Sequence, residues 1–160
     1  MKKKIAFVHN AMWEMYNFRG ELLQELKAKG YEITVICPPD EKNAHYFTDL
    51  GIKLLTVPMS RKGTNIKEDV QLVKNLFKVY KKEKFDLVFH YTIKPNIYGT
   101  LAAKLAGIKS IAITTGLGYV FLHNNITSLI AKFMYKFSLA FANEVWFLND
   151  DDMNIFLDKD

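Results

Sequence analysis

The sequence predicts a doubly wound α/β domain, in which a mainly parallel six-stranded sheet carries helices on both faces. Six short runs of β-branched and other apolar residues alternate with longer segments of helical periodicity, and this alternation is typical of βαβ units on a parallel sheet. The runs stay apolar along their length, as strands covered on both faces do. With 160 residues and 49% hydrophobic content, the chain can bury one core, so we expect a single domain over residues 1–160.

The predicted strands occupy residues 5–9, 32–37, 53–57, 87–90, 110–114 and 144–148. The short, lysine-rich start of the chain has neither the apolar length nor the cleavage site of a secretory signal. The second strand contains Cys37, the only cysteine, which cannot form an internal disulfide and suits a reducing compartment. We therefore expect a cytoplasmic protein.

Four helices are predicted between the strands, over residues 18–29, 40–50, 67–82 and 96–106. In the first, apolar residues recur at helical spacing, and Asn17 stands where an N-cap is expected. Three of the helices are followed by a glycine, at Gly30, Gly51 and Gly107. Glycine readily adopts the left-handed conformation that ends a helix, so these positions mark the helix ends.

The apolar segment over residues 121–141 has two interpretations. Its aromatic and aliphatic residues, together with Lys132 and Lys136, could lie on an anionic membrane surface. Because apolar residues occur on nearly all sides, we favour a helix packed on the sheet. The two lysines also interrupt the segment, so no run reaches the length of a membrane-spanning helix.

Several kinds of chemistry are disfavoured by the residues. The loop over residues 9–17 contains no glycine, so a dinucleotide cofactor is not expected, and no phosphate-binding loop of a nucleotide hydrolase is present. The four histidines are scattered, and the acidic run at 150–152 fits the start of a helix better than a metal site. We expect no cofactor and no metal. The net charge of +5 favours anionic partners.

Ligands of doubly wound sheets gather outside the carboxyl ends of the strands. Two histidines, His9 and His90, end predicted neighbouring strands and are the candidate catalytic residues, each as a general base or a hydrogen-bond donor. A histidine satisfied by backbone groups at a strand end is the alternative for both. The other candidate substrate-binding residues are polar or glycine residues of the same loops, namely Asn10, Asn17, Arg19, Tyr91, Lys94, Thr115, Gly116 and Gly118.

Arg19 is placed in the first turn of the predicted helix, where a cation opposes the helix dipole, and it could hold a phosphate or carboxylate. Lys94 could meet a phosphate after the fourth strand. A solvated surface cation is the alternative interpretation of both residues. The glycines after the fifth strand allow close approach of a ligand or a plain turn.

Three stretches together resemble one known family: Asn17-Phe18-Arg19, residues 90–108 with Leu-Ala-Ala-Lys-Leu-Ala-Gly at 101–107, and Thr115-Gly116-Leu117-Gly118. They are similar to the N-terminal domain of glycosyltransferase family 4. The likeness is greatest to bacterial members that add sugars to undecaprenyl-diphosphate-linked glycans or surface polysaccharides.

The resemblance implies half of a GT-B fold, in which two Rossmann-like domains face each other across a cleft. It implies a retaining transferase that needs no metal and moves a sugar from a nucleotide-sugar to a glycan or lipid-linked acceptor. The donor-binding C-terminal domain is absent from the chain, so we expect the chain alone to be inactive. Many relatives have glycines in the first loop and a histidine after the fifth strand, and this sequence has neither.

The expected partners are the nucleotide-sugar, the acceptor and the missing domain, with peripheral contact to the inner membrane face and no nucleic acid. Two other functions stay open. One is a noncatalytic α/β module that binds an anionic ligand or a protein partner. The other is half of a sugar-nucleotide epimerase of the same architecture.

Overall fold

The computed structural model describes residues 2–61, 65–117, 121 and 126–157. Six strands form one sheet in the order β3-β2-β1-β4-β5-β6, and each neighbouring pair is parallel. The strands are β1 (Lys4–Val8), β2 (Glu32–Cys37), β3 (Lys53–Thr56), β4 (Leu87–Tyr91), β5 (Lys109–Thr114) and β6 (Glu144–Phe147). The predicted fold class is confirmed. The order reverses between β1 and β4, where doubly wound sheets form a ligand crevice.

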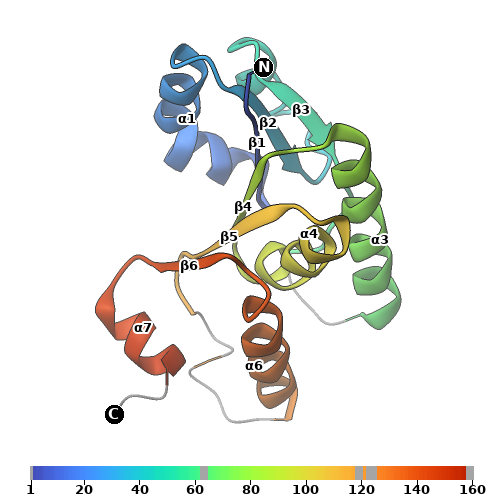
Figure 1. Cartoon of the computed structure of the whole chain (residues 1–160), viewed down its shortest axis with the longest axis vertical. Helices are drawn as coiled ribbons and strands as arrows, with labels where there is room; N and C mark the ends of the chain where they lie inside the picture. Colours follow the sequence, from blue (N-terminus) through green and yellow to red (C-terminus); the bar gives the residue numbers. More distant parts are fainter. Residues whose placement is uncertain (1, 62–64, 118–120, 122–125, 158–160) are drawn as a thin grey trace.

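Helices cover both faces of this sheet (Figure 1). One face carries α1 (Met12–Ala28) and α2 (His45–Thr48); the other carries α3 (Ile66–Glu83), the π-helical η1 (Pro95–Gly99), α4 (Thr100–Ala106) and α6 (Ile126–Leu139), and α7 (Asp150–Leu157) follows β6. Successive strand residues point to opposite faces. In β1, Phe7 therefore packs with the α1 side, whereas Ala6 and Val8 pack with the α3 side.

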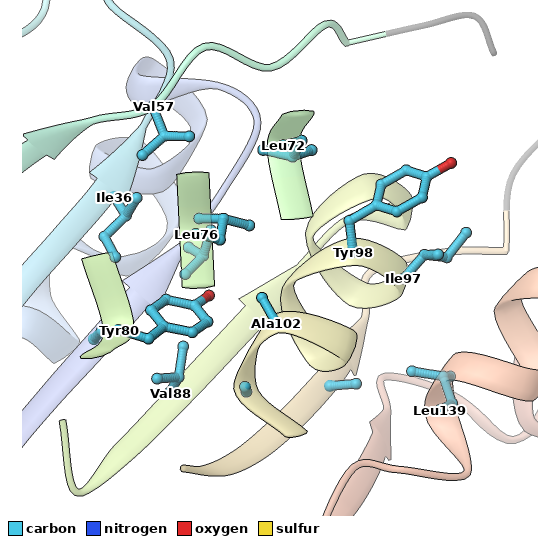
Figure 2. Packing of buried hydrophobic residues seen from close by; sticks show 14 of the residues in the cluster. Ile36, Val57, Leu72, Leu76, Tyr80, Val88, Ile97, Tyr98, Ala102 and Leu139 are labelled. Carbon is cyan, nitrogen blue, oxygen red and sulfur yellow. The ribbon is translucent and has the colours of Figure 1, made fainter. Parts of the chain in front are cut away.

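The larger core lies between the sheet and helices α3 and α4. Figure 2 shows Leu72, Leu76 and Tyr80 on successive turns of α3, with Tyr80 beside Val88 of β4 and Ala102 of α4. The small side chains of α4 allow its backbone to approach the sheet closely, as the alanine-rich sequence predicts. This packing fixes the carboxyl ends of the central strands relative to one another.

The first helix begins six residues earlier than predicted, at Met12 instead of residue 18. Met12 and Met15 are buried together with Leu23, so they extend the apolar side of the helix by more than one turn, and no proline or glycine interrupts residues 12–19. Asn17 is consequently an exposed residue inside the helix. Its predicted role as N-cap was wrong.

The second predicted helix, over residues 40–50, is reduced to the single turn of α2. The Asp40 side chain accepts hydrogen bonds from the Asn43 backbone N–H and from Asn43 Nδ2, at 3.2 and 2.7 Å. Such side-chain bonds compete with the helical backbone pattern and favour turns. The segment therefore starts as turns and becomes helical only at His45.

The predicted glycine helix ends are confirmed. Gly30 has φ 90° and its N–H bonds to the Lys27 carbonyl at 2.9 Å, while the next N–H, of Tyr31, bonds to Leu26 at 3.1 Å. These two bonds satisfy carbonyls that the last helical turn leaves open. Gly51 and Gly107 have the same left-handed backbone, with φ 62° and 73°.

The acidic run begins α7, with all three aspartates in the first turn, and the Asn149 side chain accepts from the Asp152 N–H at 2.7 Å. The expected helix-start role of these residues is confirmed. In the part of the chain that the structure describes, no helix is long and apolar enough to cross a membrane.

Candidate functional site

His9 lies directly after β1, at the carboxyl edge of the sheet and on the α1 side. Its Nδ1 accepts a hydrogen bond from the Ala11 N–H at 3.0 Å, so the proton of the neutral ring resides on Nε2. Burial lowers the pKa of His9 to about 4. The ring is therefore neutral at physiological pH, and it offers Nε2–H as a hydrogen-bond donor rather than a free base.

His9 forms part of the wall of a cavity of about 300 Å³. The other lining residues come from α1, from the end of β4 and from the segments after β5 and β6. The full set is His9, Glu14, Phe18, Arg19, Tyr91, Thr115 and Leu148. Four predicted site residues, His9, Arg19, Tyr91 and Thr115, meet here. We call this cavity the His9 pocket.

Charged groups surround the His9 pocket. Glu14 Oε2 lies 4.0 Å from His9 Nε2, and Glu14 Oε1 forms an ion pair with Arg61 Nη2. The Arg19 guanidinium lies over the Tyr91 ring, 5.2 Å from its centre, a cation–π contact. Burial also raises the pKa of Tyr91, which stays protonated. The pocket lining thus combines one cation, Arg19, one carboxylate, Glu14, and three neutral polar groups, and Arg61 adds a second cation through its ion pair with Glu14.

Four residues of this neighbourhood were missed by the sequence analysis: Glu14, Phe18 and Leu148 as lining residues, and Arg61. Glu14 and Phe18 are four residues apart, so they share one side of α1 once the helix is known to begin at Met12. A helical reading of residues 12–19 would have found them. Arg61 follows β3 and is connected to the pocket by its ion pair with Glu14.

His90 does not lie in the His9 pocket. Its ring is fully buried on the α3 side, where Nε2 and the Tyr80 hydroxyl are 2.9 Å apart and Nδ1 and the Thr100 hydroxyl are 3.3 Å apart. The reason is the strand period: in β4, His90 shares its face with Val88, whereas Tyr91 faces α1. The structure therefore does not bring the two candidate histidines together, and His90 is a core residue with satisfied hydrogen bonds.

Lys94 is also buried, at 8% exposure, instead of being a loop cation. Its Nζ contacts Asp69 Oδ1 at 2.8 Å and the Ser60 hydroxyl at 2.7 Å, and the Tyr98 hydroxyl donates to Asp69 Oδ2 at 2.8 Å. A buried charge needs such partners. Lys94, Asp69 and Ser60 border a second cavity of about 610 Å³ at the ends of β2 and β3. Because Asp69 belongs to α3, its contact with Lys94 connects the segment after β4 to that helix.

The turn after β4 is strained. Thr92 has φ 69°, a left-handed conformation that is rare for a β-branched residue. Within the described residues, the buried Thr92 hydroxyl and Asn96 Oδ1 have no hydrogen-bond partner. Asn96 Nδ2 donates to the Ile113 carbonyl at 2.9 Å and to the Tyr135 hydroxyl at 2.8 Å. Strain of this kind is found at binding sites, and here it borders the crevice between β1 and β4.

The remaining predicted site residues have separate positions. Asn10 is buried beside His9 but does not line the pocket, and Asn17 is on the exposed side of α1. Gly116, next to Thr115, has φ 120° and open space where a side chain would be. Gly118 lies outside the described residues. No group of three or more potential metal ligands occurs among the described side chains.

Residues 4–149 match the family described as "Glycosyl transferase 4-like". The chain therefore belongs to this family of glycosyltransferases, as the sequence resemblance predicted. The family model covers every strand of the sheet and all residues of the His9 pocket.

Two characterised relatives are similar to the chain. It is 31% identical over 157 residues to the N,N'-diacetylbacillosaminyl-diphospho-undecaprenol alpha-1,3-N-acetylgalactosaminyltransferase of Campylobacter jejuni, covering 93% of this chain and 41% of that protein. It is 25% identical over 126 residues to the UDP-Gal:alpha-D-GlcNAc-diphosphoundecaprenol alpha-1,3-galactosyltransferase of Escherichia coli, covering 78% of this chain and 32% of that protein. The chain thus spans less than half the length of either relative.

Solved structures share the fold. The Acinetobacter baumannii MurG matches with a TM-score of 0.67 at 15% identity, over 92% of this chain and 42% of MurG. The Neisseria meningitidis UDP-GlcNAc 2-epimerase matches with a TM-score of 0.69 at 16% identity, over 98% of this chain and 43% of the epimerase. At such identities the likeness shows the fold alone. A transferase and an epimerase share this half of their architecture.

Proposed function

We propose that the chain is the acceptor-binding domain of a retaining glycosyltransferase that moves a sugar from a nucleotide-sugar to a polyprenyl-diphosphate-linked glycan. The observation that carries this proposal is the position of the His9 pocket, at the carboxyl edge of β1, β4 and β5 in a chain of the glycosyl transferase 4-like family. Both named relatives act on diphospho-undecaprenol substrates.

The His9 pocket has groups suited to positioning an acceptor. His9 Nε2–H can donate to a sugar hydroxyl, and Tyr91 and Thr115 add neutral polar groups. Arg19 supplies positive charge beside them. Such fixed donors accelerate transfer by orienting the attacking hydroxyl and by stabilising negative charge.

Donor chemistry requires a second domain in this proposal. Relatives are more than twice as long as the stretch they share with the chain, which supports a C-terminal domain that binds the nucleotide-sugar across a cleft. We therefore expect the 160-residue chain to bind acceptor but to transfer no sugar by itself.

Membrane contact is a further part of the proposal. Five apolar side chains on and after α6 are exposed, between 37% and 70%, namely Leu129, Ile130, Phe133, Phe137 and Phe141. The opposite side of α6 is buried at Tyr135, Ser138 and Leu139, so the helix both packs on the core and presents an apolar row. With Lys132 and Lys136 on the same helix, this row fits the interface of an anionic membrane, where a lipid-linked acceptor resides.

The acceptor proposal is tested by titrating the chain with N-acetylglucosaminyl-diphospho-farnesol, a short-chain acceptor analogue, while recording backbone amide NMR spectra. We expect shifts at His9, Arg19, Tyr91 and Thr115. The variant His9→Phe removes the Nε2–H donor and should weaken binding about tenfold, whereas His45→Phe, at an exposed histidine outside the pocket, should not.

Two results would refute the acceptor proposal. One is the absence of analogue-dependent shifts around the His9 pocket in a chain whose spectrum is otherwise that of a folded protein. The other is interconversion of free UDP-N-acetylglucosamine without any acceptor, which would identify an epimerase half.

A further inference from the structure

Arginine is scarce in this chain, and its placement is selective. Of the 22 Lys and Arg residues only two are arginine, Arg19 and Arg61. They are 42 residues apart, on α1 and after β3, yet both act electrostatically on His9. The other cations are lysines and are spread along the sequence. Arginine differs from lysine in its planar fork of donors, which matches the oxygens of phosphate and carboxylate groups.

Arg61 is held by an anion that belongs to the chain itself. Its Nη2 contacts Glu14 Oε1, and Glu14 Oε2 lies 4.0 Å from His9 Nε2. Glu14 thus accepts from an arginine while facing a histidine N–H, which are the contacts that a phosphate oxygen would make in the same place. The side chains of Arg61 and Glu14 are 63% and 30% exposed, and ion pairs exposed in this way are weak.

Arg19 lines the same pocket as Glu14. Its guanidinium rests over Tyr91 and donates through Nη1 to the Phe18 carbonyl at 2.8 Å. In the part of the chain that the structure describes, no carboxylate is within ion-pair distance of Arg19. Its orientation is fixed by an aromatic ring and a backbone carbonyl, and most of its N–H donors remain available to a ligand.

We propose that Arg19 and Arg61 together bind the diphosphate of a substrate, and that Glu14 occupies Arg61 until this diphosphate displaces it. The inference rests on the proposed function, and it adds the ligand chemistry and a competing internal anion. A diphosphate carries more charge than one carboxylate and can engage both guanidinium groups, so it displaces Glu14 from Arg61. The amino-terminal end of α1, where Glu14 lies in the first turn, favours an anion at the same position.

The test uses the 160-residue chain and inorganic pyrophosphate, with calorimetry as the readout. The charge-conserving variants Arg19→Lys and Arg61→Lys should each weaken pyrophosphate binding about tenfold, because each loses a bidentate contact. Glu14→Gln should strengthen binding about threefold, since it removes the competing anion.

Matched controls lie at the far end of α1, at the exposed pair of Glu25 and the C-cap residue Lys29. Glu25→Gln changes the net charge as Glu14→Gln does, and Lys29→Arg exchanges the same two residue types in reverse; neither should alter binding by more than experimental error. Equal effects in the arginine variants and these controls would overturn the proposal, as would a lack of pyrophosphate binding by the unmodified chain.

The source of the diphosphate is resolved by two further titrations. Farnesyl diphosphate represents the acceptor, and uridine diphosphate represents the donor. Arginine-dependent binding that favours either compound supports the two-arginine site and identifies which substrate it takes. Because pyrophosphate contains no sugar, the site can be confirmed even if the acceptor analogue fails to bind, so the two proposals fail separately.

Discussion

At the scale of single residues, the direction in which a side chain points matters more than its position in sequence. His9 directly follows β1, and His90 lies in the neighbouring strand β4, where it is paired in register with Val8. One residue of offset turns the two rings to opposite faces of the sheet, so His9 enters a pocket and His90 enters the core. The sequence pattern predicted that both histidines lie at the carboxyl edge of the sheet. The alternation of strand side chains between the two faces places them on opposite sides of it.

The close approach of Gly99 to His90 can be tested by substitution. A Cβ at residue 99 would lie 2.5 Å from His90 Cδ2 and 2.6 Å from Nε2, and the ring has no room to move because it is fully buried. Gly99→Ala should lower the free energy of unfolding by about 1–3 kcal/mol, measured by urea denaturation. Gly20→Ala is the control, since its nearest contact would be an ordinary 3.5 Å; equal stability of the two variants would contradict the packing.

The buried histidines predict a loss of stability in acid. Burial lowers the pKa of His90 from 6.5 to about 3 and that of His9 to about 4. Below pH 6.5 the unfolded chain takes up protons that the folded chain does not. The free energy of unfolding therefore decreases as the pH is lowered, by up to about 1.4 kcal/mol per pH unit for each histidine. His90→Gln should flatten this dependence between pH 6.5 and about 4, as measured by urea denaturation across that range, and an unchanged dependence would contradict the burial of a neutral His90 ring.

At the scale of elements, sequence patterns predicted which segments are helices and strands better than where they begin. All six strands follow from short apolar runs, and the helix ends follow from the glycines after them. Both are local features of the sequence. The start of α1 was misplaced because Asn17 was interpreted as an N-cap. Met12 and Met15 belong to the buried side of the helix, and this becomes clear only once their packing with residues of the β-strands is known. The pocket residue Glu14 was lost with that boundary.

The two asparagines near helix starts offer a direct comparison. Asn65 caps α3, and its Oδ1 accepts from the N–H groups of Lys67 and Glu68 at 3.1 and 3.4 Å. Asn65→Ala should therefore cost about 1 kcal/mol of unfolding free energy, and Asn65→Asp should restore it. Asn17→Ala, inside α1, should be neutral or slightly stabilising because alanine is the better helix former; a cost equal to that of Asn65→Ala would reinstate a capping role.

At the scale of the whole molecule, the described chain presents its polar pocket at one edge of the sheet and its apolar row on α6. The pocket could be located from the sequence because parallel strands share one carboxyl edge. The row could not be, since an apolar helix gives the same sequence signal whether all or only part of it is buried. Only the packed structure separates the buried side, at Tyr135 and Leu139, from the exposed side at Phe133 and Phe137.

The proposed membrane contact through that exposed row can be tested by sedimentation with vesicles. We expect the chain to sediment with vesicles that contain phosphatidylglycerol, and to remain in solution with pure phosphatidylcholine vesicles. The double variant Phe133→Ser, Phe137→Ser should lose sedimentation while keeping the same unfolding transition, because both rings are more than half exposed and stack on each other. Unchanged sedimentation of this variant would exclude α6 as the contact.

The π-helical turn at Pro95–Gly99 holds one residue more than an ordinary α-helical turn would at the same place. Deleting one residue there would restore an ordinary helix and rotate the preceding side chains by about 100° relative to α4. Asn96 would then leave the Ile113 carbonyl and the Tyr135 hydroxyl, and β5 and α6 would lose their shared anchor. Aligned relatives that keep this asparagine should accordingly show neither gaps nor insertions across these five positions.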